Sequence, residues 1–233
     1  MRVYRNNELA GIEIQHIVLA DIVMIVSFSL FLSGGIYALS SGSRFLMDFL
    51  SFIPIVAVGV TLSFILHELM HKFVAQHYGA IAGFRTSPMG LAITLITSAF
   101  GFMIGIPGAT MIYAHNFTKR HNGIVSLAGP LTNLAVFAVF LLIGIAANPP
   151  AASYMSLVIS FTIFINLFLA FFNMLPIFPL DGSKVFVWNK PVYFAMMALL
   201  IVLLITFTAI SWTTIAFMLF VAIMFSMMYR QVL

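Results

Sequence analysis

The sequence has 233 residues, of which 63% are hydrophobic and 7% charged, with a mean hydropathy of +1.15. A soluble globular domain carries about 25% charged residues, so this composition excludes that class and indicates an integral membrane protein. There is no cysteine, which excludes disulfides and thiolate metal sites. We interpret the net charge of +4 as a sign of membrane topology, not of nucleic-acid binding.

Six apolar stretches are long enough to cross a membrane as helices, for which about 20 residues each are needed. The predicted spans are residues 17–39, 50–78, 123–147 and 152–172, followed by two that share residues 191–229. Ser211 and Trp212 lie near the turn between these last two. No polar block is long enough to fold separately. We therefore predict one domain, residues 1–233, with an all-α fold of six transmembrane helices.

Residues 88–114 are apolar and long enough to form a further span, but their composition argues against a helix. This segment contains several β-branched residues together with Gly90, Gly101, Gly105, Pro107 and Gly108. Glycine and proline weaken helices, whereas β-branched residues favour strands. We expect extended strands or a re-entrant segment here, associated with the membrane between the second and third spans.

The distribution of basic residues favours the same interpretation. If residues 88–114 do not cross, nine of the ten basic residues share one side of the membrane with both termini, and Arg44 alone lies opposite. If the segment does cross, four of the ten basic residues lie on one side of the membrane and six on the other. Because basic loops stay in the cytoplasm, we predict a multi-pass cell-membrane protein with both termini cytoplasmic.

The sequence HELMH at residues 67–71 places ionisable side chains in an apolar helix, where they are costly without a partner. His67 and His71 are four residues apart, so both imidazoles share one helix face and can bind a single zinc ion. Zinc lowers the pKa of a bound water, and Glu68 can act on that water as general base. The alternative is a polar helix seam in which Glu68 pairs with one histidine.

A catalytic zinc needs a third protein ligand and one open position. Glu8 and Glu13 precede the first span, in what we take as an amino-terminal tail, and Asp48 lies in the loop on the far side. Asp21 is near the start of the first span. Asp181, in NMLPIFPLDGSK, remains, and the six-span topology brings it to the membrane face of HELMH. The alternative for Asp181 is an ordinary Asp-Gly turn.

Three motifs in this order resemble the site-2 proteases, which are intramembrane zinc metalloproteases. They are HELMH at 67–71, AGPLTN at 128–133 and NMLPIFPLDG at 173–182. The resemblance covers a core at about residues 50–190. It implies one zinc per chain held by His67, His71 and Asp181, with Glu68 as catalytic base, near the cytoplasmic side.

The resemblance also suggests roles for four further positions. Asn173 matches a family asparagine that would polarise the scissile carbonyl or stabilise the oxyanion, although a helix-packing amide fits equally well. Gly129, Pro130 and Asn133 match a family element that is structural or adjacent to substrate. Lys72 departs from the small residue of many relatives, and we expect it to snorkel to the cytoplasmic interface. The chain has no room for the PDZ or CBS domains of many relatives.

The implied function is an endopeptidase that cleaves transmembrane segments of single-span proteins, with the lipid bilayer as its other partner. A prenyl-protein peptidase is disfavoured because such enzymes use a later glutamate as third ligand, and none follows Glu68. The remaining alternatives are a catalytically silent substrate-binding homologue and a membrane metal transporter. The sequence predicts neither the natural substrate nor the oligomeric state.

Overall fold

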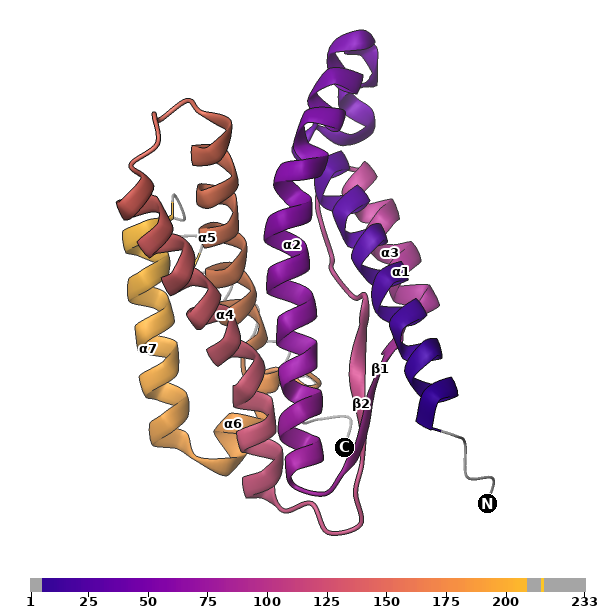
Figure 1. The fold of residues 1–233 in the computed structure, drawn as a ribbon, viewed down its shortest axis with the longest axis vertical. Helices are drawn as coiled ribbons and strands as arrows, with labels where there is room; N and C mark the ends of the chain where they lie inside the picture. The colour runs from indigo at the N-terminus through magenta and orange to yellow at the C-terminus, as the bar shows by residue number, and fades with distance from the viewer. Residues whose placement is uncertain (1–5, 209–214, 216–233) are drawn as a thin grey trace.

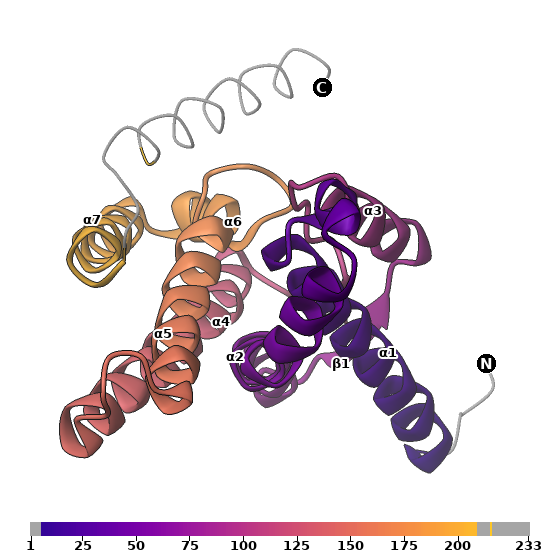
Figure 2. The ribbon, with the colours of Figure 1, turned by 90° about the horizontal axis from the view of Figure 1, so that it is seen from above.

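The computed structural model describes residues 6–208 and residue 215. Its elements follow the chain in the order α1 (Asn6–Leu32), the 3-10 helix η1 (Gly35–Ser41), α2 (Ser43–His77), β1 (Ile81–Thr86), α3 (Pro88–Ala99), β2 (Gly108–Tyr113), α4 (Lys119–Ala147), α5 (Tyr154–Asn173), α6 (Asp181–Trp188) and α7 (Lys190–Phe207). The fold is therefore mostly helical, with one small sheet. Figure 1 shows the long helices running up and down side by side, and Figure 2 shows them from above.

Five of these helices are long and apolar enough to cross a membrane. They are Gly11–Leu32 within α1, together with α2, α4, α5 and α7. They correspond to the first five predicted spans. The predicted sixth span lies outside the described residues, so the count of six stays a prediction.

The first helix begins earlier than the sequence suggested. Helix α1 starts at Asn6, and Glu13 is a buried helical residue with 7% exposure instead of part of a tail. Our expectation of an amino-terminal tail was wrong at this point because Glu13 has buried partners, described below, that offset the cost of burying its charge.

The segment between α2 and α4 is only partly extended. Strands β1 and β2 pair antiparallel, with Phe84 opposite Thr110 in the register. Between them, residues 88–99 form a helix, which corrects the expectation of strands. The Ser87 side chain accepts a hydrogen bond from the Gly90 N–H and Pro88 occupies the first turn, two features that start helices well. With 12 residues, α3 is shorter than a helical span.

Helix α2 is the central element, packing against α1 on one side and against α4 and α5 on the other. One buried apolar cluster joins α1, α2 and the β1–α3 region, and includes Met24, Val60 and Phe84. A second joins α4 to α7 and includes Phe171 and Leu200. One end of the bundle, the lower end in Figure 1, brings together the carboxyl end of α2, the start of α4 and the short helix α6.

Candidate metal centre

The HELMH residues lie near the carboxyl end of α2, on its face toward α4 and α6. His67 is 5% and His71 8% exposed. Their ring centroids are 4.6 Å apart, as expected for residues one helical turn apart. Both rings therefore project from a single helix into the protein interior, as the sequence predicted.

Asp181 is brought to these rings by a tight connection between α5 and α6. It is the first residue of α6 and is 7% exposed. A Cβ at Gly182 would lie 2.0 Å from the carbonyl oxygen of Met174, at the end of α5. Only glycine allows this close approach, so the Asp-Gly pair is a packing requirement and not just a turn.

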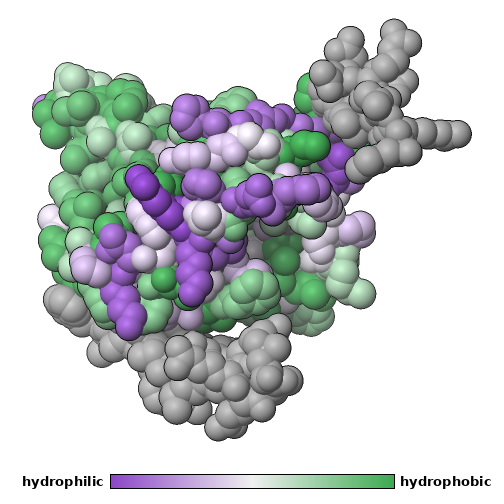
Figure 3. All heavy atoms as spheres, turned by 90° about the horizontal axis from the view of Figure 1, so that it is seen from below, coloured by the Kyte–Doolittle hydropathy of each residue, from purple (hydrophilic) through white to green (hydrophobic). Residues whose placement is uncertain are grey.

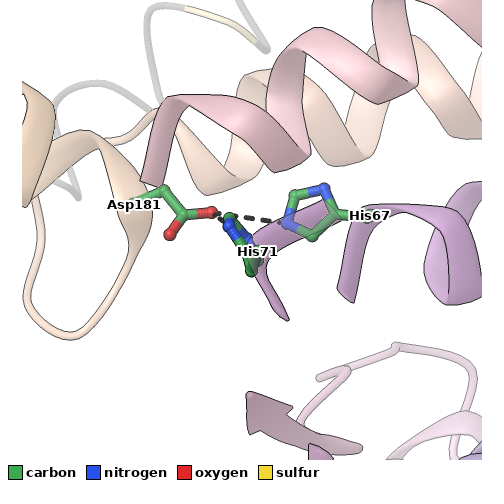
Figure 4. Close-up of side chains that lie close together, drawn as sticks. All are labelled: His67, His71 and Asp181. Carbon is green, nitrogen blue, oxygen red and sulfur yellow. Dashed lines mark ion pairs between the residues drawn. The ribbon is translucent and has the colours of Figure 1, made fainter. Parts of the chain in front are cut away.

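The three side chains converge on one point (Figure 4). Oδ2 of Asp181 lies 3.3 Å from Nε2 of His67 and 3.1 Å from Nε2 of His71. One donor atom from each residue falls within 4.8 Å of the other two. Two imidazoles and one carboxylate form a donor set suited to zinc, and three protein ligands leave the fourth position for water or substrate.

The other ring nitrogens of the two histidines have partners that fix their tautomers. Nδ1 of His67 donates to Oδ1 of Asn133, and Nδ1 of His71 donates to the carbonyl oxygen of Val125 at 2.8 Å. Each Nε2 is then the nitrogen that faces the cluster, where a bound metal ion would take the place of a proton. Metal-binding histidines in proteins have such partners. The residues present therefore fit a zinc ion.

Asn133 is itself held in one orientation. It has no exposure, and its Nδ2 donates to the Ser63 carbonyl and to Oδ1 of Asn166, each at 3.0 Å. Since both donor bonds use the NH₂ group, Oδ1 must face His67. Asn166 in turn donates to the Thr162 carbonyl at 2.9 Å. Each side-chain nitrogen and oxygen of these two amides therefore has a partner, and the amide chain aligns His67.

Gly129, on α4, provides the space in front of the two rings. A Cβ at this position would lie 2.5 Å from Nε2 of His67 and 2.6 Å from Nε2 of His71. No side chain fits there, because even a Cβ would overlap both Nε2 atoms. The AGPLTN motif therefore contributes to the site twice, through Gly129 and through Asn133.

The charge state of Asp181 also suits metal binding. Burial by itself raises the pKa of this carboxyl, but the adjacent His71 and His67 outweigh burial and hold the pKa well below its usual range. Nζ of Lys184 lies 3.8 Å from the other oxygen, Oδ1. Asp181 is thus a carboxylate, which is the form that binds a metal.

Glu68 does not pair with a histidine; it is bonded to strand β2. Its Oε2 accepts hydrogen bonds from the backbone N–H of Thr110 at 2.9 Å and from the Thr110 hydroxyl at 2.8 Å. Within the part of the chain that the structure describes, Oε1 makes no hydrogen bond. The polar-seam alternative, in which Glu68 bonds to a histidine, therefore does not describe this site.

Two other sequence expectations concern Lys72 and Asn173. Nζ of Lys72 lies 2.6 Å from Oε2 of Glu13, a partner that the sequence did not suggest, and its expected position at the membrane interface stays a prediction. Asn173 is half-buried at the end of α5, and its Nδ2 donates to the Leu169 carbonyl at 3.0 Å. Its catalytic role stays a prediction.

Comparison with known proteins adds an independent observation. The model of peptidase family M50 matches residues 142–190. "Putative zinc metalloprotease MJ0611" of Methanocaldococcus jannaschii is 46% identical over 138 residues, which cover 59% of this chain and 70% of that protein. This chain belongs to peptidase family M50, the site-2 protease family. The resemblance inferred from the three motifs is thereby confirmed.

Further relatives agree. "Putative zinc metalloprotease YwhC" of Bacillus subtilis is 31% identical over 161 residues, covering 61% of this chain and 72% of that protein. "Putative zinc metalloprotease Rip2" of Mycobacterium tuberculosis is 33% identical over 145 residues, which cover 56% of this chain and 55% of that protein. No solved structure is significantly similar. As a multi-pass M50 protein, this chain is a zinc metalloprotease.

Several residues around the site were not found by sequence reasoning. Val125 contributes only a backbone carbonyl, which leaves no trace in residue identity. Thr110 and Asn166 are polar residues in apolar segments, and that pattern is a usable signal because such residues need partners at membrane depth. The sequence shows that a partner is needed but not which group provides it.

The space at Gly129 predicts the effect of adding one methyl group. We expect Gly129→Ala to lower zinc affinity by at least about tenfold, because its Cβ would force the two Nε2 atoms apart. In a helix interior alanine is more favourable than glycine by about 1 kcal/mol, so unfolding of α4 would not explain a loss of bound zinc. Bound zinc, measured by mass spectrometry after dialysis, tests this. Gly144→Ala, on the same helix, is the control, and equal zinc in both variants would refute the prediction.

The hydrogen bond from His67 to Asn133 predicts a second effect on the metal. Asn133→Ala should weaken zinc binding by about 10- to 100-fold, since His67 loses the partner that fixes its tautomer and ring orientation. A competition titration with a chelator measures this. Asn173→Ala removes an amide bonded only within its own helix and should leave zinc affinity unchanged. An unchanged affinity in Asn133→Ala would show that the ring is held by packing alone.

Proposed function

We propose that this protein is an intramembrane endopeptidase that binds one zinc ion per chain and cleaves transmembrane segments of single-span membrane proteins. The observation that carries the proposal is the convergence of His67, His71 and Asp181, from two elements over a hundred residues apart, on one buried point. Ionisable groups at such a position need compensation, which a metal ion would provide for all three together.

The role proposed for each residue follows from its position. His67, His71 and Asp181 would hold the zinc, which when bound supplies a Lewis acid that polarises the scissile carbonyl and activates a water. Glu68 is the adjacent carboxylate: Thr110 binds one oxygen, and the other can accept a proton from water and pass it to the leaving amine. Asn173 keeps its proposed role at the oxyanion.

Strand β2 offers a way to hold a substrate extended. A helical peptide bond is shielded, so a transmembrane substrate must unwind before it is cut. Phe84 and Thr110 face each other in the register, and the N–H of each donates outward, to Glu13 and to Glu68 respectively. The outer edge of β2 therefore borders the catalytic base. A substrate strand added at this edge would lie beside the metal ligands.

The proposed orientation places both termini and the site toward the cytoplasm. Lys119, Lys184 and Lys190 lie near the junctions where α4, α6 and α7 begin, at the end of the bundle that carries the site. Figure 3 views this end from below, where hydrophilic side chains gather. Basic residues concentrate on the cytoplasmic side of membrane proteins, and water would reach the site from there.

Replacing the proposed base separates an enzyme from the alternatives. Glu68→Gln should retain one zinc per chain but lose cleavage of a model single-span substrate by at least about 100-fold, since the amide cannot take a proton. Bound zinc and product formation in detergent or liposomes test this. Equal cleavage by the variant would refute the assigned base. Zinc binding without cleavage by the wild type would favour a silent homologue, and zinc flux into liposomes a transporter.

The absence of cysteine allows the orientation to be tested with single introduced thiols. The two positions to replace are Asn116, in the connection from β2 to α4, and Ser41, the last residue of η1 before α2, and both are exposed. In intact cells a membrane-impermeant maleimide should label position 41 only, and position 116 should react after permeabilisation. Labelling of both positions in intact cells would mean that residues 88–114 cross the membrane.

A further inference from the structure

The proposed catalytic base is connected to a second α2 residue, Lys72, by a series of contacts that passes through both strands and α1. Glu68 binds Thr110 on β2, and Thr110 faces Phe84 on β1. The Phe84 N–H donates to Oε1 of Glu13 on α1 at 3.1 Å. The other oxygen of Glu13, Oε2, accepts a hydrogen bond from Nζ of Lys72 at 2.6 Å, so this series of contacts ends on α2.

The two α2 residues in this series of contacts, Glu68 and Lys72, are also spaced to bind each other. Glu68 and Lys72 are four positions apart on the helix, with the glutamate on the amino-terminal side. This spacing and order are the favourable arrangement for an ion pair on a helix. An ammonium group bound to Glu68 would occupy the carboxylate oxygen that has to face the water. The sequence thus places an inhibitory partner one turn from the proposed base.

In the structure Lys72 is turned to Glu13 instead. Glu13 is 7% exposed, and each of its oxygens has one partner, the Phe84 N–H and the Lys72 ammonium. A buried carboxylate held by a backbone donor is a fixed acceptor, unlike an exposed side chain that samples many positions. The Lys72 side chain is 20% exposed, so most of it is enclosed in this contact.

We propose that Glu13 is a positioning residue for the protease: it binds Lys72 and thereby keeps that cation away from Glu68. Because it assigns Glu68 as the base, this inference rests on the proposed function. It accounts for two features that the mechanism leaves unexplained, namely a buried acid on the first helix and a lysine directly after the second histidine. Thr110 completes the arrangement by giving Glu68 a neutral partner in place of Lys72.

A purely structural ion pair makes a different prediction, and a double-mutant cycle separates the two. If Glu13 and Lys72 only join α1 to α2, removing either residue leaves an unpaired buried charge, and both variants should lose activity alike. If Glu13 restrains Lys72, only the loss of Glu13 should impair the base. Loss of Lys72 should lower thermal stability but leave kcat unchanged.

The activity test compares Glu13→Gln, Lys72→Met and the double variant. Glutamine keeps an oxygen for the Phe84 N–H but removes the charge that binds Lys72. We expect Glu13→Gln to lower kcat by at least about tenfold on a model single-span substrate, with KM and bound zinc unchanged. Lys72→Met and the double variant should retain wild-type kcat. Asp21→Asn is the matched control, since Asp21 also joins α1 to α2, through Thr61 at 2.8 Å, and should have no effect.

A second measurement does not depend on proteolysis. A zero-length carbodiimide cross-linker, followed by peptide mass spectrometry, should join Lys72 to Glu13 in the wild type and Lys72 to Glu68 in Glu13→Gln. Equal losses of kcat in both single variants, full activity in Glu13→Gln, or no Lys72–Glu68 product would each overturn the inference. If the wild type cleaves nothing, the proposed function fails, while the cross-linking result still decides where Lys72 goes.

Discussion

Every polar side chain at membrane depth needs a partner, and the hydrogen bond from His67 to Asn133 shows how that constraint organises this protein. Asn133 can accept from His67 only because its own NH₂ group is bound to Ser63 and Asn166. These bonds join α2, α4 and α5, the helices around the site. The same contacts that satisfy buried amides therefore fix the relative positions of the helices and the ring orientation of a candidate metal ligand.

The other half of the molecule is governed by the same constraint. The β1–β2 sheet has two edges whose backbone donors would be costly in an apolar environment. Glu13 binds one edge at Phe84, and Glu68 binds the other at Thr110. Two acidic residues thus each bind one outward N–H of the sheet, and the sheet in turn determines where their carboxylates lie. The proposed catalytic base is consequently linked to α1 as well as to its own helix.

Sequence reasoning succeeded where the pattern is local or where alternatives are few. The helical spacing of HELMH placed two histidines on one face, and the small number of acidic residues led to Asp181 as their partner. It failed for residues 88–99, where glycine and β-branched content suggested strands but the cap at Ser87 starts a helix. It also missed the pairing of Glu13 with Lys72, because each residue was judged alone and its partner lies 59 residues away.

The sequence by itself determined that the protein is a membrane protein of the site-2 protease family and which residues form its candidate metal-binding motif, because hydropathy and motif spacing are properties of neighbouring residues. Only the tertiary structure decided how those residues are aligned. The carbonyl of Val125, the space at Gly129 and the donors of Thr110 act on α2 from other elements. Such contacts depend on how helices pack, and residue identity alone does not encode which backbone group will face which side chain.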